Sequence, residues 1–288
     1  MRIWLILLCL LATDVSAQEH PSTASEPQEA GNEIVVVGRE TSEKQVSDFV
    51  KGLTWAPHAR TIARFEGEWV CPLAFGLSVK YNRLITERMR KVARAAGVGL
   101  AAEPCTPNAL VIFADDKLAT VRQLERERPQ MFPEDRVRLS EEPGPAIAWR
   151  VLGKIDLDGV RAHGIVARTT RPASRLVELV RPIFDLSVVV IERDAIEGFT
   201  TVQVADYAAM RVLTTANPAR AQDSGAPTIL SIMTTPKDQP APVTLTTWDL
   251  SFLRSLYALP VGQSAAAQRG MIGDSMRRDF GTVPVRKP

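Results

Sequence analysis

The chain has 288 residues, of which 45% are apolar, 24% are charged and 6% are aromatic. This composition is typical of a folded protein and excludes collagen-like, wholly disordered and multi-span membrane chains. The 35 basic residues are nearly balanced by 33 acidic residues, which gives a formal charge of +2. Because so small a positive excess cannot follow a phosphate backbone, we do not expect a nucleic acid as partner.

The N-terminus has the three parts of a secretory signal peptide. Arg2 supplies positive charge, residues 3–12 form an uninterrupted apolar run, and Val15-Ser16-Ala17 places small residues before a cleavage point at Gln18. The apolar run is too short to cross a bilayer as a helix, which takes roughly 20 residues. We therefore expect residues 1–17 to be removed and the mature protein to reach the periplasm or the cell exterior. No later segment is expected to span a membrane.

Two cysteines remain in the mature chain, because Cys9 leaves with the signal peptide. They are Cys71 and Cys105. An exported protein meets an oxidising compartment, where such a pair forms a disulfide. The alternative is two separate buried thiols, since free cysteine is often buried.

The start of the mature chain predicts a leader followed by a strand. Residues 18–31 are rich in Pro, Ser, Glu and Gln, which is typical of a disordered segment. We expect one α/β domain over residues 32–282 and a frayed tail over residues 283–288. Glu33–Arg39 (EIVVVGR) has the β-branched residues of a strand. It is similar to a short element of outer-membrane receptors that couple to TonB, which implies strand addition to a partner; the alternative is the first strand of the domain.

Apolar residues at helical or strand spacing mark the remaining elements. Helices are predicted over residues 41–53, 78–96, 115–129, 201–213, 247–257 and 263–280. Strands are predicted over residues 109–114, 146–155, 164–169 and 184–192. Irregular structure is expected over residues 54–76 and in the Pro-rich loops 217–227 and 236–242. This arrangement predicts an α+β fold, with a mixed sheet and packed helices.

Metal and cofactor motifs of standard spacing are absent from the sequence. His20, His58 and His163 are far apart, and none has a second ligand at zinc spacing. Gly97-Val98-Gly99-Leu100-Ala101-Ala102 has the letters of a dinucleotide fingerprint. A predicted helix precedes it, however, where that motif needs a strand. We therefore expect neither a metal nor an organic cofactor.

A short motif near the C-terminus, Gly273-Asp274-Ser275-Met276, is similar to the nucleophile block of GDS-type esterases. Those enzymes carry the block early in the chain, after a strand, and need an Asp and a His downstream. No histidine follows Ser275 in this chain. Since the general base is missing, the motif does not predict an esterase.

A longer pattern extends from the region before the first mature cysteine to the penultimate predicted helix. It consists of Arg64, Cys71-Pro72, the helix ending at Gly97, Cys105-Thr106-Pro107-Asn108 with the following ALVIF, Asp206, and Leu245-Thr246-Thr247-Trp248-Asp249 with Leu253 and Tyr257. Together these residues resemble a family of secreted bacterial proteins with a zincin-like, metallopeptidase-like layout. The resemblance implies a helix bearing His-Glu before a loop, and then a Leu-Thr-x-x-Asp helix that ends in Leu-Tyr.

The chain departs from that family where the zinc ligands belong. A metallopeptidase holds zinc with two histidines one helical turn apart and activates water with a glutamate. This chain has Asp206-Tyr207-Ala208-Ala209-Met210 there; tyrosine is not the usual base, and methionine is a poor zinc ligand. The resemblance therefore implies a catalytically silent protein with a degenerate cleft, lined by Asp206, Tyr207 and Arg211 with Arg64 nearby.

We expect an exported binding or accessory protein of the bacterial cell envelope, without catalysis, whose partner is a peptide, a glycan or an envelope protein. The alternative is that the candidate residues are structural. In that case Tyr207 and Met210 pack in the core, and Asp206 is solvated or pairs with an arginine.

Two other functions stay open at this point. The first is a hydrolase that uses Asp206 with Asp115 or Asp116 as its carboxylates, one of them with a raised pKa. The second is coupling to an envelope transporter through the Glu33–Arg39 strand.

Overall fold

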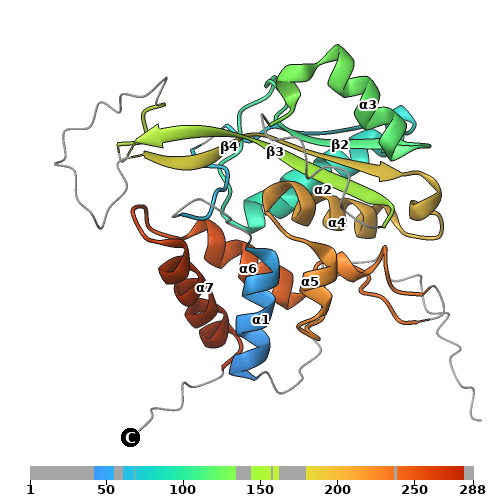
Figure 1. The fold of residues 1–288 in the computed structure, drawn as a ribbon. Helices are drawn as coiled ribbons and strands as arrows, with labels where there is room; N and C mark the ends of the chain where they lie inside the picture. Colours follow the sequence, from blue (N-terminus) through green and yellow to red (C-terminus); the bar gives the residue numbers. More distant parts are fainter. Residues whose placement is uncertain are drawn as a thin grey trace, which may run out of the picture. The chain divides into compact units, whose positions relative to one another are not determined.

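The computed structural model of the protein describes residues 42–54, 61–67, 69–133, 144–156, 158–161, 180–236 and 239–281. Within these ranges one sheet has the strands β1 (Pro72–Phe75), β2 (Ala109–Ala114), β3 (Ala146–Asp156) and β4 (Val180–Glu192). Their spatial order is β1-β2-β4-β3. Strands β1, β2 and β4 run parallel, and β3 is antiparallel to β4 at one edge (Figure 1). The mixed sheet and the α+β class that the sequence predicts are therefore confirmed.

The helices that accompany this sheet in the described residues are α1 (Glu43–Leu53), α2 (Val79–Ala95), α3 (Lys117–Glu127), α4 (Thr201–Leu213), α5 (Pro218–Gln222), α6 (Thr247–Tyr257) and α7 (Ala265–Asp279). Short 3₁₀ turns occur at η1 (Pro129–Met131), η3 (Asp194–Ile196) and η4 (Ile229–Ser231). None of these helices combines the length and the hydropathy that crossing a membrane requires.

The two faces of the sheet are covered by different helices. Figure 1 shows α3 on one side of the sheet and α2 with α4 on the other. Val111 and Phe113 of β2 belong to the larger core, which includes residues of α2 and α4. Leu110 and Ile112 belong to the smaller core, which includes Val121 of α3. Because successive strand residues point to opposite faces, a sheet covered on both sides needs an apolar strand such as β2.

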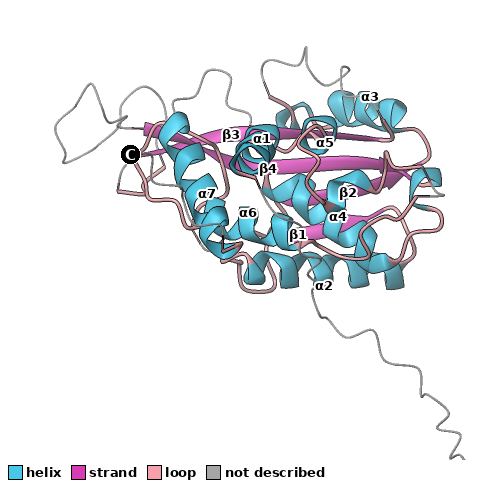
Figure 2. Cartoon of the chain, turned by 90° about the horizontal axis from the view of Figure 1, so that it is seen from below, coloured by secondary structure: helices cyan, strands magenta, loops and turns pink. Residues whose placement is uncertain are grey.

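Helix α2 also protects the β1 edge of the sheet. Figure 2 shows the strands side by side, with α2 running along the edge that β1 forms. The hydroxyl of Thr86 in α2 accepts a hydrogen bond of 2.9 Å from the backbone N–H of Ala74 in β1. An edge strand exposes unpaired backbone groups, and this contact satisfies one of them.

Aromatic rings join α1, α6 and the end of α7 in the larger core. Phe49 of α1 meets Trp248 of α6 edge to face, with ring centroids 5.3 Å apart. Trp248 also contacts Phe280, which follows α7, at 4.7 Å. Such pairs add to the free energy gained from burying the rings, so they fix α6 and α7 against each other.

Helix α4 lies inside the larger core, where all its residues from Gln203 to Leu213 are buried. Its first turn is closed by a capping box: the Thr200 hydroxyl accepts from the Gln203 N–H, and the Gln203 side chain accepts from the Thr200 N–H. A helix without a solvent-facing side must satisfy its polar side chains within the protein. Asp206 and Arg211 of α4 must therefore find their charge and hydrogen-bond partners within the protein.

Most predicted elements agree with the described ones. Helices α4 and α6 and strand β2 begin and end as the apolar pattern predicts. Strand β4 begins earlier than predicted, because Val180–Ile183 pair with β3 beyond the apolar run. The predicted strands over residues 33–39 and 164–169 lie outside the described residues.

Two short elements fall where the sequence predicts irregular structure, so those predictions are wrong. Strand β1 lies in the stretch 54–76, and α5 lies in the loop 217–227. Strand β1 has four residues, two buried and two exposed, which is too short a pattern to stand out. Helix α5 begins at Pro218 after the N-cap Asn217; proline resembles a loop residue but suits the first turn of a helix.

A disulfide joins the chain segments that lead into the parallel strands β1 and β2. Cys71 and Cys105 are bonded at 2.08 Å, with Cα atoms 6.0 Å apart. Cys71 directly precedes β1, and Cys105 lies in the loop before β2. The predicted disulfide is therefore confirmed, and it closes a loop of 34 positions that contains β1 and α2.

Removing this disulfide should destabilise the protein by roughly 3 to 4 kcal/mol, because the bridge restricts the unfolded chain over a long loop. The change is the double variant Cys71→Ser/Cys105→Ser, measured by urea unfolding without reductant. As a control, reductant should bring the wild type to the stability of the variant and leave the variant unchanged. Two free thiols in denatured, unreduced wild-type protein would contradict the bridge.

Candidate functional site

Asp206 lies in the middle of α4, and its side chain is fully buried. Arg88 of α2 donates to both of its oxygens, from Nε to Oδ1 at 2.7 Å and from Nη2 to Oδ2 at 2.9 Å. The Thr244 hydroxyl and the Leu245 backbone N–H donate to Oδ2 at 2.7 and 2.8 Å. A carboxylate has about four lone-pair sites, so these contacts leave little capacity for a metal or a ligand.

The other candidate side chains of α4 are buried as well. Tyr207, Met210 and Arg211 are 2%, 0% and 1% exposed. Nη1 of Arg211 donates to the Tyr207 hydroxyl at 3.3 Å, and the guanidinium lies 5.9 Å from the centre of the Tyr207 ring. Met210 belongs to the larger core. These side chains therefore contact other groups of the protein itself. Their role in binding stays a prediction.

Arg64 lies in the segment before β1 and is 5% exposed. Its Nη2 donates to the Leu259 carbonyl at 2.9 Å and lies 3.5 Å from Oε1 of Glu66. Burial lowers the pKa of Arg64 from its usual value, while the Glu66 charge opposes that change. Glu66 also binds Arg181 of β4, with 2.6 Å between Oε2 and Nη2. These contacts join Arg64 to β4 and to the loop after α6, rather than to Asp206.

The carboxylates of the hydrolase alternative are not brought together. Asp115, after β2, has an 84% exposed side chain that forms an ion pair with Arg193. Asp116 is the N-cap of α3 and accepts from the Ala119 N–H at 2.8 Å. No contact among the described residues joins either of them to Asp206. The geometry therefore does not favour a paired-carboxylate site.

Asp249 of α6 is a second fully buried carboxylate. It accepts from the Thr228 hydroxyl at 2.6 Å and from the Ile229 N–H at 2.8 Å, and it forms a capping box with Thr246. Burial raises the pKa of Asp249 to about 6, although these hydrogen bonds act in the opposite direction. The Leu-Thr-x-x-Asp pattern marks this residue in the sequence, but its burial and its contacts with η4 are visible only in the structure.

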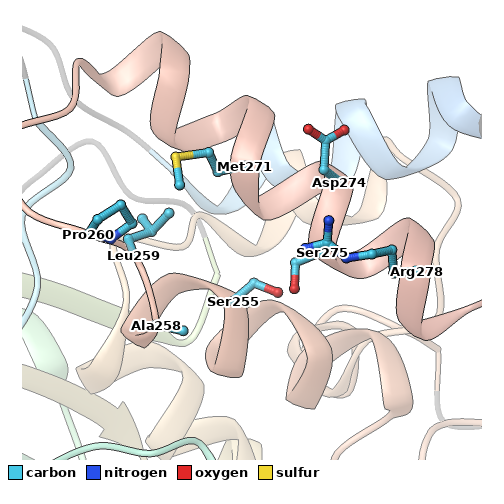
Figure 3. Close-up of a pocket in the computed structure, with 8 residues that line it drawn as sticks. All are labelled: Ser255, Ala258, Leu259, Pro260, Met271, Asp274, Ser275 and Arg278. Carbon is cyan, nitrogen blue, oxygen red and sulfur yellow. The ribbon is translucent and has the colours of Figure 1, made fainter.

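A pocket of about 240 Å³ lies between α6 and α7 (Figure 3). Its lining consists of Ser255, Ala258, Leu259 and Pro260 from α6 and the following loop, and Met271, Asp274, Ser275 and Arg278 from α7. Ser255 is 5% exposed, and its hydroxyl has no hydrogen-bond partner among the described residues. This pocket was not expected from the sequence, because its lining comes from two helices that share no motif.

Ser275 belongs to the Gly273–Met276 motif that resembles an esterase nucleophile block. The structure places the whole motif within α7 rather than after a strand. Asp274 forms an ion pair with Arg277. The motif therefore marks one wall of the pocket, and its helical setting agrees with the prediction that it is not an esterase block.

The described residues hold no group of three or more His, Cys, Asp or Glu side chains that could bind a metal ion together. His20, His58 and His163 lie outside the described residues. The candidate sites of the described chain are therefore the buried α4 residues and the α6–α7 pocket.

Comparison of the chain with protein-family models, with curated proteins and with solved structures found no match. The resemblance to a secreted zincin-like family therefore stays a prediction. The contacts of α4 and the α6–α7 pocket are the observations that bear on function.

Breaking the buried ion pair should cost more than breaking an exposed one. We expect Arg88→Met to destabilise the protein by about 3 to 5 kcal/mol, because it leaves the Asp206 carboxylate buried without a counter-charge. Glu87→Gln is the matched control, since Glu87 pairs with Arg83 at the exposed surface of the same helix. Such pairs contribute little. Equal losses for the two variants in urea unfolding would contradict the structural role of Asp206.

The raised pKa of Asp249 predicts a pH dependence of stability. The folded protein keeps a proton on this carboxyl that the unfolded chain releases above its ordinary pKa of 3.8. Its contribution to stability is therefore complete below that value and is lost as the pH rises through about 6. At about 1.4 kcal/mol per pKa unit, the loss is about 3 kcal/mol.

The measurement is urea unfolding of the wild type and of Asp249→Asn at several pH values from 4 to 7. The free energy of unfolding of the wild type should fall relative to that of Asp249→Asn across this range. The control Asp223→Asn, at an exposed position, should follow the wild-type profile. Parallel profiles for wild type and Asp249→Asn would show that Asp249 does not titrate there.

Proposed function

We propose that the protein is an exported, non-catalytic binding or accessory protein of the bacterial cell envelope, with a zincin-like layout. Its partner would be a peptide, a glycan or another envelope protein. The observation that carries the proposal is the saturation of the Asp206 carboxylate by Arg88, Thr244 and Leu245. At the position of the first zinc ligand, this carboxylate serves the packing of α2 against α4.

The residues at the other two positions of the zinc motif, Tyr207 and Met210, also support a non-catalytic protein. Where a metallopeptidase needs a glutamate, Tyr207 is buried beside Arg211, and where it needs a second histidine, Met210 packs in the core. Neither side chain offers the base or the ligand of zinc hydrolysis. The replacement of all three groups by side chains with structural partners supports a protein without zinc chemistry.

The order of the later elements supports the zincin-like layout. Helix α4 follows β4 and η3, and a segment that contains the short helix α5 and the turn η4 leads from α4 to α6. Helix α6 is preceded by Leu245 and Thr246, contains Asp249 and ends at Tyr257. A Leu-Thr-x-x-Asp helix after α4 agrees with what the resemblance implies, whereas α5 and η4 lie where the resemblance implies a loop. The Tyr257 hydroxyl donates to the Leu213 carbonyl at 2.8 Å, so the two helices are joined at their ends.

Export is supported by the Cys71–Cys105 disulfide. Disulfides form and persist in oxidising compartments and are rare in the cytosol. The signal-peptide pattern of residues 1–17 leads to the same proposal, with a mature chain that starts at Gln18. The transporter-coupling alternative depends on Glu33–Arg39, which lies outside the described residues.

The proposal predicts the metal content and activity of the protein recovered from the periplasm. We expect far less than one zinc per chain by elemental analysis, because no α4 residue is placed to hold it. We also expect no peptidase activity that a chelator abolishes. A zinc peptidase carried through the same purification serves as the positive control.

One zinc per chain together with chelator-sensitive peptide cleavage would overturn the non-catalytic proposal. Retention of the chain in the cytoplasm, with residues 1–17 still attached, would overturn export. The two results are separable, since the first concerns α4 and the second concerns the N-terminus.

A further inference from the structure

We propose that the α6–α7 pocket binds a ligand group that has both a carboxylate and a small apolar side chain. The lining of the pocket includes no residue of α4, so this proposal does not depend on whether α4 has lost the zinc ligands of a metallopeptidase. It adds a ligand class and a place on the molecule to a protein proposed to act by binding.

The hydroxyl of Ser255 is the first observation. It lies at the pocket wall, is buried, and has no hydrogen-bond partner among the described residues. A serine in a helix often bonds the carbonyl one turn earlier, and Ser255 does not do so. Buried polar groups without a partner are rare because they cost free energy. A ligand oxygen in the pocket would accept the missing hydrogen bond.

A guanidinium at the same pocket is the second observation. Arg278 is exposed, and the described residues provide its side chain with no ion pair or hydrogen bond. It lies one helical turn after Ser275, so the two side chains share a face of α7. Figure 3 shows Ser275 and Arg278 on the α7 wall, with the hydroxyl of Ser255 directed from α6 toward that wall. Arginine and hydroxyl donors together suit a carboxylate.

The acidic residues nearby are already engaged. The Asp274 carboxylate lines the pocket but forms an ion pair with Arg277. Figure 3 shows it directed away from Ser255. Asp279 accepts a hydrogen bond of 2.6 Å from the Ser251 hydroxyl. The guanidinium of Arg278 is therefore the charge of the lining that has no partner among the described residues.

The rest of the lining sets the size and polarity of the ligand. Leu259, Pro260 and Met271 form an apolar wall, and Met271 is 38% exposed. The volume of about 240 Å³ is below the range of about 300 to 1,000 Å³ that is typical of drug-sized ligands. The pocket fits a group the size of one amino acid. Such a group is either a free acylated amino acid or the C-terminal residue of a peptide.

The test is calorimetric titration of the full mature protein with three probes. These are N-acetyl-leucine, its amide N-acetyl-leucinamide, and an acetylated tetrapeptide that ends in leucine with a free carboxylate. We expect N-acetyl-leucine to bind weakly, as ligands of this size do, and the amide to bind at least tenfold more weakly because it lacks the charge. A tetrapeptide that binds as tightly as N-acetyl-leucine would identify a peptide C-terminus, and one that binds tenfold more weakly would identify a free small acid.

Two pairs of variants separate binding from folding. Arg278→Gln should weaken N-acetyl-leucine at least tenfold, while Arg83→Gln, a matched change on α2 away from the pocket, should leave the affinity unchanged. Ser255→Ala should weaken binding about fivefold without lowering the melting temperature, because its hydroxyl has no partner to lose. Ser251→Ala, on the same helix, should lower the melting temperature through loss of its bond to Asp279 and leave the affinity unchanged.

Three results would overturn the proposal: no binding of any probe, equal affinity for the acid and the amide, or an unchanged affinity in Arg278→Gln. A lower melting temperature for unliganded Ser255→Ala would show that its hydroxyl has a protein partner, which also contradicts the proposal. Zinc content and peptidase activity do not enter these measurements, so a failure here is distinct from a failure of the proposed function.

Discussion

The burial of one negative charge constrains the packing of three separate segments. Asp206 sits in the part of α4 whose residues are all buried, so its carboxylate must be neutralised and hydrogen-bonded within the protein. Arg88 supplies the charge from α2, and Thr244 with Leu245 supplies further donors from the chain just before α6. Helix α2, helix α4 and the start of α6 are therefore fixed together, and the position of α6 in turn sets one wall of the pocket with α7.

Most of the helices and strands could be predicted from the sequence, because they are long and their apolar residues recur at clear intervals. Helices α4 and α6 and strand β2 could be delimited from apolar spacing alone, and the disulfide could be expected from the two cysteines that follow the predicted signal peptide. Strand β1 could not be found, because its four residues, which begin with Pro72, are too few to show a clear alternation in the sequence. The order β1-β2-β4-β3 also could not be read from the sequence, since it depends on which strands pair across long stretches of chain.

The candidate site was only partly predictable. Asp206 could be singled out by its position, and the possibility that it pairs with an arginine could be stated, but which arginine could not. Arg88 lies 118 positions away along the chain. The sequence alone does not distinguish it from the other basic residues of α2, because only the packing of α2 against α4 shows which of them faces Asp206. The α6–α7 pocket could not be predicted from the sequence for a similar reason. An unpartnered serine hydroxyl is a property of the packing around it, and the sequence carries no sign of that packing.

The closed loop between Cys71 and Cys105 also bears on the order in which the chain assembles. Parallel strands are slow to pair, because a long stretch of chain must be closed before any contact compensates for the lost entropy. Strands β1 and β2 are such a pair, with Pro72 opposite Ala109. Once the bridge has formed, their first residues are already neighbours, so the search that limits parallel pairing is short. When the bridge closes before these strands pair, β1, α2 and β2 therefore come together with a smaller loss of chain entropy than in the reduced chain.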